Sequence, residues 1–343
     1  MSALDADTAR ADPTLGWNPD GVGPREPGVL LNLHGLAAAP AVNPSDSTPA
    51  ASWPPASSRQ RPRPTSAWPT SAVGVMGILN LTPDSFSDGG RWTDPSAALR
   101  QAGRMLRQGA QVLDLGAQST RPGAAIIGPE RELERLLPTL RAIRAAHPDA
   151  ILSVDTFHAA VAEAALAAGA DWINDVTAGR ADPAMGSVLA EQGCPCVLMH
   201  SRGDSQSMDG LTDYGDVVED VRAALLRSSE TLLAAGVRRE QIIWDPGLGF
   251  AKTADQNLAL LQGLHHLTSE GFPLLVGPSR KRFIGAVLEE PRPRARLWGT
   301  AAVCVQAVLQ GASLLRVHDV GPIVQVARMA SALRPEAQNT SRG

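Results

Sequence analysis

Residues 73–80 read Val73-Gly-Val-Met-Gly-Ile-Leu-Asn80, an apolar run that stops on a polar amide. Seven further runs of this kind end on, or lead to, polar or charged residues; they begin at Val112, Ile151, Trp172, Pro195, Ile242, Pro273 and Leu314. A short continuous apolar run bounded by turn residues is typical of a parallel strand buried on both faces. The sequence therefore predicts eight such strands.

Segments of helical length separate these runs. We expect helices over 95–108, 129–146, 158–168, 183–192, 214–235, 253–267, 294–309 and 320–333. Pro95, Pro129 and Pro183 suit the first turn of a helix, where the missing N–H costs nothing. A strand followed by a helix, repeated eight times, indicates an α/β protein with a (β/α)8 TIM barrel. In such barrels the residues just beyond the C-terminal strand ends meet on one face and carry the chemistry.

The composition limits the class of protein and its partners. The chain has 343 residues, of which 43% are hydrophobic and 4% aromatic, so its core is mainly aliphatic. The formal net charge is −4 and there is no basic block, which argues against nucleic acid or an anionic membrane as a partner. No apolar stretch reaches the roughly 20 residues that span a bilayer, and the acidic N-terminus does not have the pattern of a secretory signal.

The three cysteines, Cys194, Cys196 and Cys304, are too few and too unevenly spaced for a disulfide framework. A C-x-C pair without further ligands is also poor evidence for a metal site. We therefore expect reduced, buried thiols, as in a cytoplasmic protein.

The first 70 residues differ in composition from the rest. They hold 12 of the 27 prolines among Ala, Ser, Thr and Gly, and they have almost no periodic apolar face. Such a segment buries too little surface to offset its ordering entropy. We expect a disordered extension over 1–70, a barrel domain over 71–335 and a disordered tail over 336–343. A start codon assigned too far upstream would give the same composition.

Polar residues end three of the predicted strands. Asp155 and Asp245 each finish an apolar run, and Asn174 finishes a run between them. One such carboxylate could simply cap the next helix, as Asp155 could. Several around one barrel mouth indicate a site, because a carboxylate accepts from two adjacent N–H groups and an amide pairs with a neighbouring donor and acceptor. This set suits a planar heterocycle with an amino-pyrimidinone edge.

Basic residues follow the last two predicted strands, in Ser279-Arg-Lys-Arg282 and Arg316-Val-His318. Residues two apart on a strand point the same way, so Arg316 and His318 would face one site. The ends of strands seven and eight are also where barrels commonly bind phosphate. Lys281, Arg316 and His318 are thus candidate ligands of an anion or of an acceptor-rich ring edge. Arg280 and Arg282 could instead be solvated surface charges.

Three loops combine turn residues with polar groups. The loop from Asn80 to Gly90 holds the hard oxygens of Asp84 and Asp88. Asn80 could give an oxygen to Mg2+, which prefers few protein ligands together with substrate phosphate. An ordinary loop of capping residues is the alternative. Ser119-Thr-Arg-Pro-Gly123 and Asp245-Pro-Gly-Leu-Gly-Phe-Ala-Lys252 have similar character.

Several of these segments resemble the signatures of bacterial dihydropteroate synthases. The segment Gly77-Ile-Leu-Asn-Leu-Thr-Pro-Asp-Ser-Phe-Ser-Asp-Gly-Gly90 resembles the first signature, and Asp114-Leu-Gly-Ala-Gln-Ser-Thr-Arg-Pro-Gly123 resembles the second. Further blocks follow in the family's order at 153–156, 173–176, 245–250, 279–281 and 316–320. The resemblance covers about 73–333.

The resemblance implies a transferase of folate biosynthesis. In that reaction (7,8-dihydropterin-6-yl)methyl diphosphate condenses with 4-aminobenzoate to give 7,8-dihydropteroate and diphosphate. The resemblance also implies Mg2+ as cofactor, a homodimer as the assembly, and sulfonamides as competitors of aminobenzoate. The diphosphate substrate would bind first, because the loops after the first two strands would order over it and create the second pocket.

Site residues are carried over by motif. The pterin would be held by Asp155, Asn174, Met199, Asp245 and Lys281. The diphosphate would meet Asn80, Thr120, Arg316 and His318, with the metal at Asn80. The aminobenzoate would lie among Thr120, Arg121, Pro122, Phe250 and Arg282, and the first loop would contribute Asp84, Phe86 and Asp88. The residues expected to take part in the chemistry itself are Asp155, Asn80, Lys281, Arg316 and His318.

Two departures from the family pattern and two alternatives remain. Ala117 and Gln118 stand where the family often has Gly-Glu, and Arg282 stands where some members have Ser. A cation at 282 could bind the benzoate carboxylate directly. A catalytically silent paralogue that binds pterin would share all these motifs. A corrinoid-type pterin methyltransferase would share the barrel, but it handles no diphosphate and lacks the Ser-Thr-Arg-Pro-Gly and Ser-Arg-Lys blocks.

Overall fold

The structure is a computed structural model that describes residues 73–82 and 95–334. The expected extension over 1–70, the tail over 336–343 and the loop residues Asp84, Phe86 and Asp88 lie outside these ranges.

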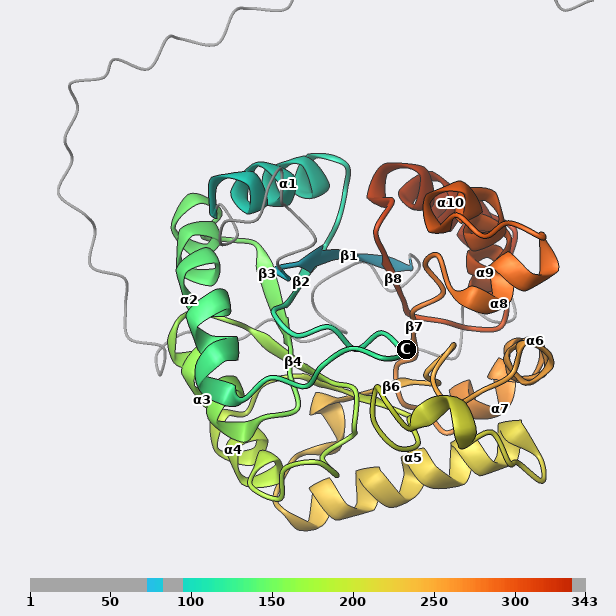
Figure 1. Ribbon diagram of the computed structural model, residues 1–343, viewed down its shortest axis with the longest axis horizontal. Helices are drawn as coiled ribbons and strands as arrows, with labels where there is room; N and C mark the ends of the chain where they lie inside the picture. The colour runs from blue at the N-terminus through green and yellow to red at the C-terminus, as the bar shows by residue number, and fades with distance from the viewer. Residues whose placement is uncertain (1–72, 83–94, 335–343) are drawn as a thin grey trace, which may run out of the picture. The chain divides into compact units, whose positions relative to one another are not determined.

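Eight parallel strands form the centre of the protein (Figure 1). They are β1 (Gly74–Asn80), β2 (Val112–Gly116), β3 (Ile151–Asp155), β4 (Trp172–Asp175), β5 (Cys196–Met199), β6 (Ile242–Asp245), β7 (Leu275–Val276) and β8 (Leu314–Val317). The strand order is β6-β5-β4-β3-β2-β1-β8-β7, so β1 pairs with both β2 and β8. A single parallel bridge between Trp244 and Leu274 crosses the remaining gap between β6 and β7. The predicted (β/α)8 barrel is therefore confirmed.

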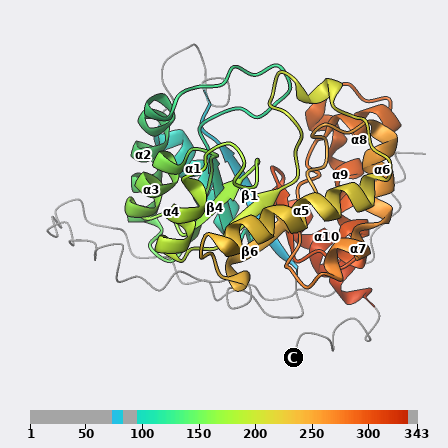
Figure 2. The same ribbon diagram turned by 90° about the horizontal axis from the view of Figure 1, so that it is seen from below.

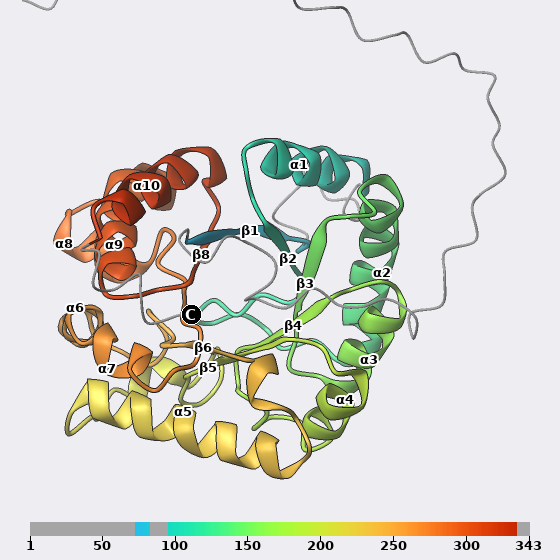
Figure 3. The same ribbon diagram turned by 180° about the vertical axis from the view of Figure 1, so that it is seen from behind.

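Helices surround the strands, as the view from behind also shows (Figure 3). They are α1 (Pro95–Arg107), α2 (Pro129–Ala146), α3 (Ala159–Ala167), α4 (Met185–Gln192), α5 (Val217–Ala234), α6 (Ala254–Gln262), α7 (Leu264–Thr268), α8 (Arg282–Val287), α9 (Leu297–Leu309) and α10 (Val320–Ala332). Short 3-10 turns η2 (Met208–Gly210), η3 (Arg239–Gln241) and η4 (Pro293–Arg296) complete the set in the described ranges. Each expected helix overlaps an observed one.

Two helical segments of the structure differ from the expectation. The prediction of one helix over 253–267 is wrong, because the segment breaks at Gly263 into α6 and α7. A Cβ at position 263 would lie 2.7 Å from the Val218 side chain of α5, so the close approach of the two helices requires glycine there. The short helix α8 directly after β7 was not expected, since its six residues carry too little periodic signal.

Two layers of core side chains explain how the strands present a polar site. One cluster lies outside the sheet, against the helices. A second, smaller cluster fills the barrel and is made of Met76, Val112, Ile151, Trp172, Val197, Ile243, Leu275 and Leu314. Side chains two apart on a strand share a face. Val112, Trp172, Ile243 and Leu314 are therefore followed, one step along the barrel interior, by Asp114, Asn174, Asp245 and Arg316. The polar groups therefore form a layer at the C-terminal strand ends, directly next to the apolar cluster inside the barrel.

The three cysteines are free and buried. In the ranges that the structure describes, we find no helix long and apolar enough to cross a bilayer.

Candidate active site

An arginine joins two carboxylates at the mouth of the barrel. Nε of Arg316 donates to Oδ2 of Asp114 at 2.6 Å, and its Nη2 donates to Oδ2 of Asp155 at 2.7 Å. Nδ2 of Asn174 also donates to Oδ2 of Asp114, at 3.2 Å. The strands β2, β3, β4 and β8 thus place four polar side chains in one connected group, which brings together Asp155, Asn174 and Arg316 as the sequence predicted.

Burial and charge shift the protonation of Asp155. Burial raises its pKa to about 7, because a carboxylate is poorly solvated there. The Arg316 guanidinium opposes this shift, whereas the neighbouring Asp114 carboxylate adds to it. Asp155 therefore changes protonation near neutral pH, which makes its charge responsive to a bound ligand.

Asp245 and Lys281 stand beside this group. Asp245 is buried, its Oδ1 accepts from the Gly247 N–H at 2.7 Å, and burial raises its pKa. Burial also lowers the pKa of Lys281 to about 8, while the Asp245 carboxylate opposes that shift. Nζ of Lys281 lies 4.2 Å from the centre of the Phe250 ring, within cation–π distance. A carboxylate, an ammonium and an aromatic face therefore line one side of the mouth.

Two hydrogen-bond donors face each other at the ends of β1 and β8. Oγ of Ser279 accepts from the His318 backbone N–H at 3.1 Å and lies 2.9 Å from His318 Nδ1. When the Ser279 hydroxyl donates to Nδ1, the ring proton lies on Nε2, and we adopt this tautomer. Nε2 lies 3.5 Å from Nδ2 of Asn80, and in this tautomer the contact joins two donors rather than a donor and an acceptor. Burial, then Arg280 and Arg316, lowers the pKa of His318 to about 3, so the ring is neutral.

Asn80 also offers an oxygen to a cation. A Cβ at Gly116 would lie 3.9 Å from Asn80 Oδ1 and 3.8 Å from Asp155 Oδ2, so both oxygens lie near Gly116 on the same side of the mouth. Mg2+ accepts such hard oxygens and usually keeps water or substrate phosphate as its other ligands. The donor set therefore fits the expected metal. In the described ranges no three His, Cys, Asp or Glu side chains gather as a metal cluster.

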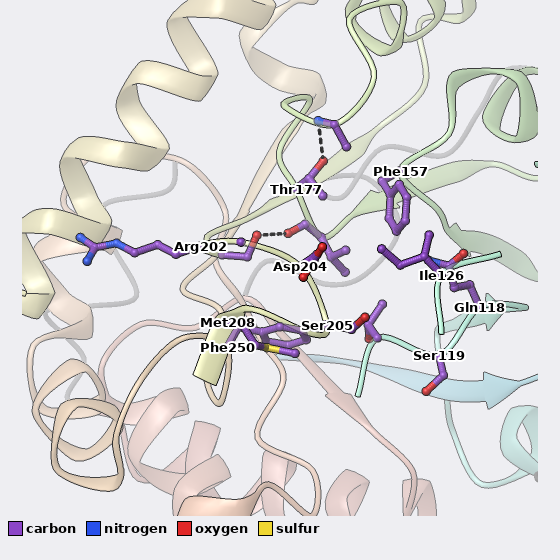
Figure 4. Close-up of a pocket in the computed structure, with 15 residues that line it drawn as sticks. Gln118, Ser119, Ile126, Phe157, Thr177, Arg202, Asp204, Ser205, Met208 and Phe250 are labelled. Atoms are coloured by element: carbon purple, nitrogen blue, oxygen red, sulfur yellow. Dashed lines mark hydrogen bonds between the residues drawn. The ribbon is translucent and has the colours of Figure 1, made fainter. Parts of the chain in front are cut away.

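A cavity of about 200 Å3 adjoins the mouth (Figure 4). Its lining includes Ser119, Thr120, Phe157, Met208 and Phe250. The loop after β2 reaches the loop after β5 there: Gly123 N–H donates to Ser205 O at 2.7 Å, and Ser205 Oγ donates to Ala124 O at 2.7 Å. Figure 2 shows both loops at one end of the barrel, at the top of that view. Segments far apart in the chain thus enclose this cavity.

The other residues expected in the site lie in or near the cavity and at the end of β5. Thr120 and Phe250 line the cavity, whereas the side chains of Arg121 and Pro122 are exposed beside it. Met199 ends β5 next to Asp245 in the strand register. Gln118, one of the two departures from the family pattern, accepts from Ile127 N–H at 3.2 Å and so ties the loop to itself.

Of the two arginines for which a solvated surface charge was the alternative, Arg280 is partly buried, whereas Arg282 is exposed to solvent. Arg280 makes a bidentate ion pair with Asp319, at 3.0 and 2.6 Å. Arg282, although exposed, pairs with Asp209 of η2 at 3.1 and 2.5 Å. A pairing across 73 residues leaves no signal in the local sequence.

The sequence analysis missed two further residues of the mouth, Asp114 and Ser279. Asp114 lies two positions after Val112, whose side chain belongs to the apolar cluster inside the barrel. The alternation of side chains along β2 could therefore have predicted that Asp114 also points inward. Ser279 acts only through its contact with His318, 39 residues away, and could not be found locally.

The chain was compared with known proteins. The family model described as "Pterin binding enzyme" matches residues 76–318. A dihydropteroate synthase of Synechocystis sp. is 49% identical over 259 residues, covering 76% of this chain and 89% of the relative.

Solved structures give the same result. The dihydropteroate synthase of Xanthomonas albilineans with 4-aminobenzoic acid has a TM-score of 0.72 and 41% identity, covering 77% of this chain and 94% of that one. The Yersinia pestis dihydropteroate synthase with a sulfonamide drug has a TM-score of 0.73 and 40% identity, covering 77% and 95%. The chain therefore belongs to the family of pterin-binding enzymes, and within it to the dihydropteroate synthases.

Proposed function

We propose that this chain condenses (7,8-dihydropterin-6-yl)methyl diphosphate with 4-aminobenzoate, giving 7,8-dihydropteroate and diphosphate in folate synthesis. The observation that carries the proposal is the connected polar layer at the barrel mouth, in which Asp155 and Asp114 share Arg316 and Asn174 joins them. Its carboxylates and amide match the donor–acceptor edge of a pterin, and its cation matches a polyanionic leaving group.

The pterin is held by hydrogen bonds of complementary type. Asp245 accepts from the two adjacent N–H groups of the amino-pyrimidinone edge, and burial makes these bonds selective because a lost partner leaves a buried charge unpaired. Lys281 donates to O4 and N5 of the ring. Asn174 and Met199 complete the walls of the pterin site.

Cleavage of the substrate's C–O bond is favoured by the groups that stabilise the negative charge of the departing diphosphate. The C–O bond between the pterin methylene and the diphosphate breaks, and the diphosphate leaves with the electron pair. Positive charge then grows on the methylene, and the Asp155 carboxylate faces it. His318 Nε2–H and Asn80 Nδ2–H, which lie side by side, both donate to the leaving group, and Arg316 and Thr120 add to it.

A magnesium ion would be held by Oδ1 of Asn80 and by the substrate's own phosphates. When bound, it would supply positive charge that stabilises the departing diphosphate. The neutral His318 ring would bind the same anion as a hydrogen-bond donor rather than as a cation.

Bond formation needs no general base. The amine of 4-aminobenzoate is a neutral nucleophile; its lone pair forms the C–N bond to the methylene, and its proton is then lost to solvent. The ring is placed by Thr120 and Phe250 of the cavity and by the exposed Arg121 and Pro122 beside it. The benzoate carboxylate pairs with Arg282, which must first exchange it for Asp209.

We also propose a homodimer and a cytoplasmic location. Val287 and Leu288 after β7 and Trp298 on α9 are exposed large apolar residues close together in the chain, with Trp298 76% exposed. Such exposed apolar side chains support an interface with a second copy. Three free, buried thiols support a reducing compartment.

The test is a condensation assay on the purified chain with Mg2+ and the pterin diphosphate. We expect diphosphate to be released slowly until 4-aminobenzoate is added, and dihydropteroate to appear in equal amount. Tight pterin binding without any dihydropteroate would instead identify a catalytically silent paralogue.

A further inference from the structure

A second cavity lies outside the barrel mouth, between the segments that follow β4 and β5 and one face of α5, the helix along the lower edge of Figure 1. Its volume is about 390 Å3, within the roughly 300–1000 Å3 typical of small-molecule sites. The small side chains Ala223 and Ala224 of α5 leave this space open. We call it the arginine pocket, defined by Arg180, His200, Ser201, Arg202, Asp220 and Arg227.

The arginine pocket has more positive than negative charge. Three guanidinium groups line it, against the single carboxylate of Asp220. Nη2 of Arg202 lies 3.5 Å from that carboxylate, and the same guanidinium stacks 3.6 Å from the centre of the Tyr214 ring. Within the described ranges, neither Arg180 nor Arg227 has a carboxylate at ion-pair distance; Arg180 instead donates to Ser201 O and Oγ at 2.8 and 3.0 Å. Two of the three guanidinium groups therefore make no ion pair in the described ranges, although burial lowers the pKa of Arg180 and the nearby buried Asp175 carboxylate opposes that shift.

His200 forms the inner wall and presents a donor. The residue is only 2% exposed, and its Nδ1 lies 2.9 Å from Nζ of Lys252. Lys252 also donates to Gly247 O and Phe250 O, both at 3.0 Å. An ammonium has no acceptor, so Nδ1 must be the acceptor and Nε2 must carry the ring proton. No hydrogen bond to Nε2 occurs among the described residues, so this N–H is left to donate to a ligand in the pocket.

The protonation of this wall agrees with an anion site. Burial, Lys252, Arg180 and Arg202 lower the pKa of His200 to about 2, and burial lowers the pKa of Lys252 to about 7. Burial is the largest cause of both shifts. The charges of Lys252, Arg180 and Arg202 add to the shift of the His200 pKa, which reports positive potential at that ring.

We propose that the arginine pocket binds a small dianion of the phosphate class, either inorganic phosphate or the phosphoryl group of a phosphomonoester. A dianion matches the excess of two positive charges in the lining. Phosphate also suits arginine, because the planar guanidinium donates two parallel N–H bonds to two phosphate oxygens. The His200 Nε2–H supplies one more donor from within.

The arginine pocket is connected to the substrate site by shared lining residues and by a hydrogen bond. Ser201 and Arg202 line both cavities, and Figure 4 shows the Arg202 side chain pointing away from the first one, toward α5. His200 also contacts Lys252, which holds the backbone of the segment that carries Asp245 and Phe250. An anion that keeps Lys252 protonated therefore steadies that segment. This consequence, unlike the binding itself, rests on the proposed function.

The experiment is a calorimetric titration of the full chain with inorganic phosphate and, separately, with glycerol 3-phosphate. The informative variant is Arg227→Gln, which removes an exposed cation of the pocket without touching the barrel mouth. Arg141→Gln, an exposed arginine on α2, is the matched control. We expect the wild type and R141Q to share a binding event whose affinity is about tenfold or more weaker in R227Q. Tighter binding of either probe supports the proposal and identifies the source of the phosphoryl group.

Equal phosphate binding by R227Q and the wild type would overturn the proposal, and so would the absence of any binding event. Phosphate can also bind at the barrel mouth, so the decisive quantity is the difference in phosphate binding between the wild type and R227Q. Condensation is assayed on the same variants without added phosphate, where we expect kcat to be unchanged in R227Q. If neither the wild type nor any variant condenses the substrates, but R227Q still binds phosphate more weakly than the wild type, the proposed function is wrong and the proposed anion site is supported.

Discussion

Nη2 of Arg316 lies 2.7 Å from Oδ2 of Asp155, which joins the end of β8 to the end of β3 across the barrel mouth. The two residues are 161 positions apart in the chain. The cation limits how far burial can raise the pKa of Asp155, and the carboxylate orients the guanidinium. The charge balance of the mouth therefore depends on both residues together.

The pterin site should depend on the Asp245 carboxylate. Asp245→Ala should abolish pterin binding, with a loss of about 100-fold or more, because the two N–H donors of the ring lose a buried charged acceptor. Isothermal titration with the pterin substrate measures this. Asp319→Ala, which removes a carboxylate of the Arg280 pair, is the control. Wild-type affinity in D245A would show that the ring binds elsewhere.

Asp114, which the sequence analysis missed, should matter for stability. Asp114→Ala leaves the Arg316 cation and the Asn174 amide without a shared acceptor, and should lower the free energy of unfolding by about 3 kcal/mol. Chemical denaturation measures the loss. Asp209→Ala breaks an exposed pair instead and should cost about 1 kcal/mol or less. Equal losses in the two variants would contradict the assigned role of the buried pair.

Stability should fall as pH rises, through Glu132 of α2. This carboxyl is 1% exposed, and burial raises its pKa to about 7 from 4.5. The folded protein thus binds the proton more tightly than the unfolded chain, so the stabilisation is present below pH 4.5 and is lost as pH rises through 7.

Glu132→Gln should therefore flatten the pH profile of the unfolding free energy between pH 4.5 and 7, whereas Glu134→Gln, an exposed neighbour on α2, should leave it unchanged. Thermal or urea unfolding at a series of pH values measures both. A profile in E132Q that still matches the wild type would mean that the carboxyl titrates normally.

Asp209 should compete with 4-aminobenzoate for Arg282. Asp209→Asn should lower KM for aminobenzoate about two- to threefold, because the substrate carboxylate no longer displaces a charged partner. Arg282→Ala should raise KM about tenfold. Sulfonamides lack a benzoate carboxylate, so their inhibition constants should change less than KM in both variants. Steady-state kinetics decides this, and an unchanged KM in R282A would remove Arg282 from the site.

Trp298 should contribute to a contact between two copies of the chain. Trp298→Glu should shift the protein from dimer to monomer, because the substitution places a charge in an apolar contact. Sedimentation velocity measures the change. Leu211→Glu, at an exposed apolar residue beside η2, is the control. A wild-type protein that sediments as a monomer would end the proposal of a homodimer.

Much of the fold followed from short-range pattern. The apolar runs predicted all eight strands, because a strand buried on both faces is mostly apolar along its length. Asp155, Asn174, Asp245 and Arg316 were found for the same reason, since each interrupts or ends such a run. The break at Gly263 and the helix α8 were not predicted, because they depend on the approach of α5 and on very short segments.

The sequence by itself determined the barrel and which strand ends carry charge, since strand periodicity and burial act between near neighbours in the chain. Only the tertiary structure decided which charges pair: Arg316 with Asp114 and Asp155, Arg280 with Asp319, and Arg282 with Asp209. It also formed the arginine pocket from the segments that follow β4 and β5 and from α5. The physical reason is that electrostatic energy depends on distance in space, and closure of the sheet brings together side chains that the chain keeps far apart.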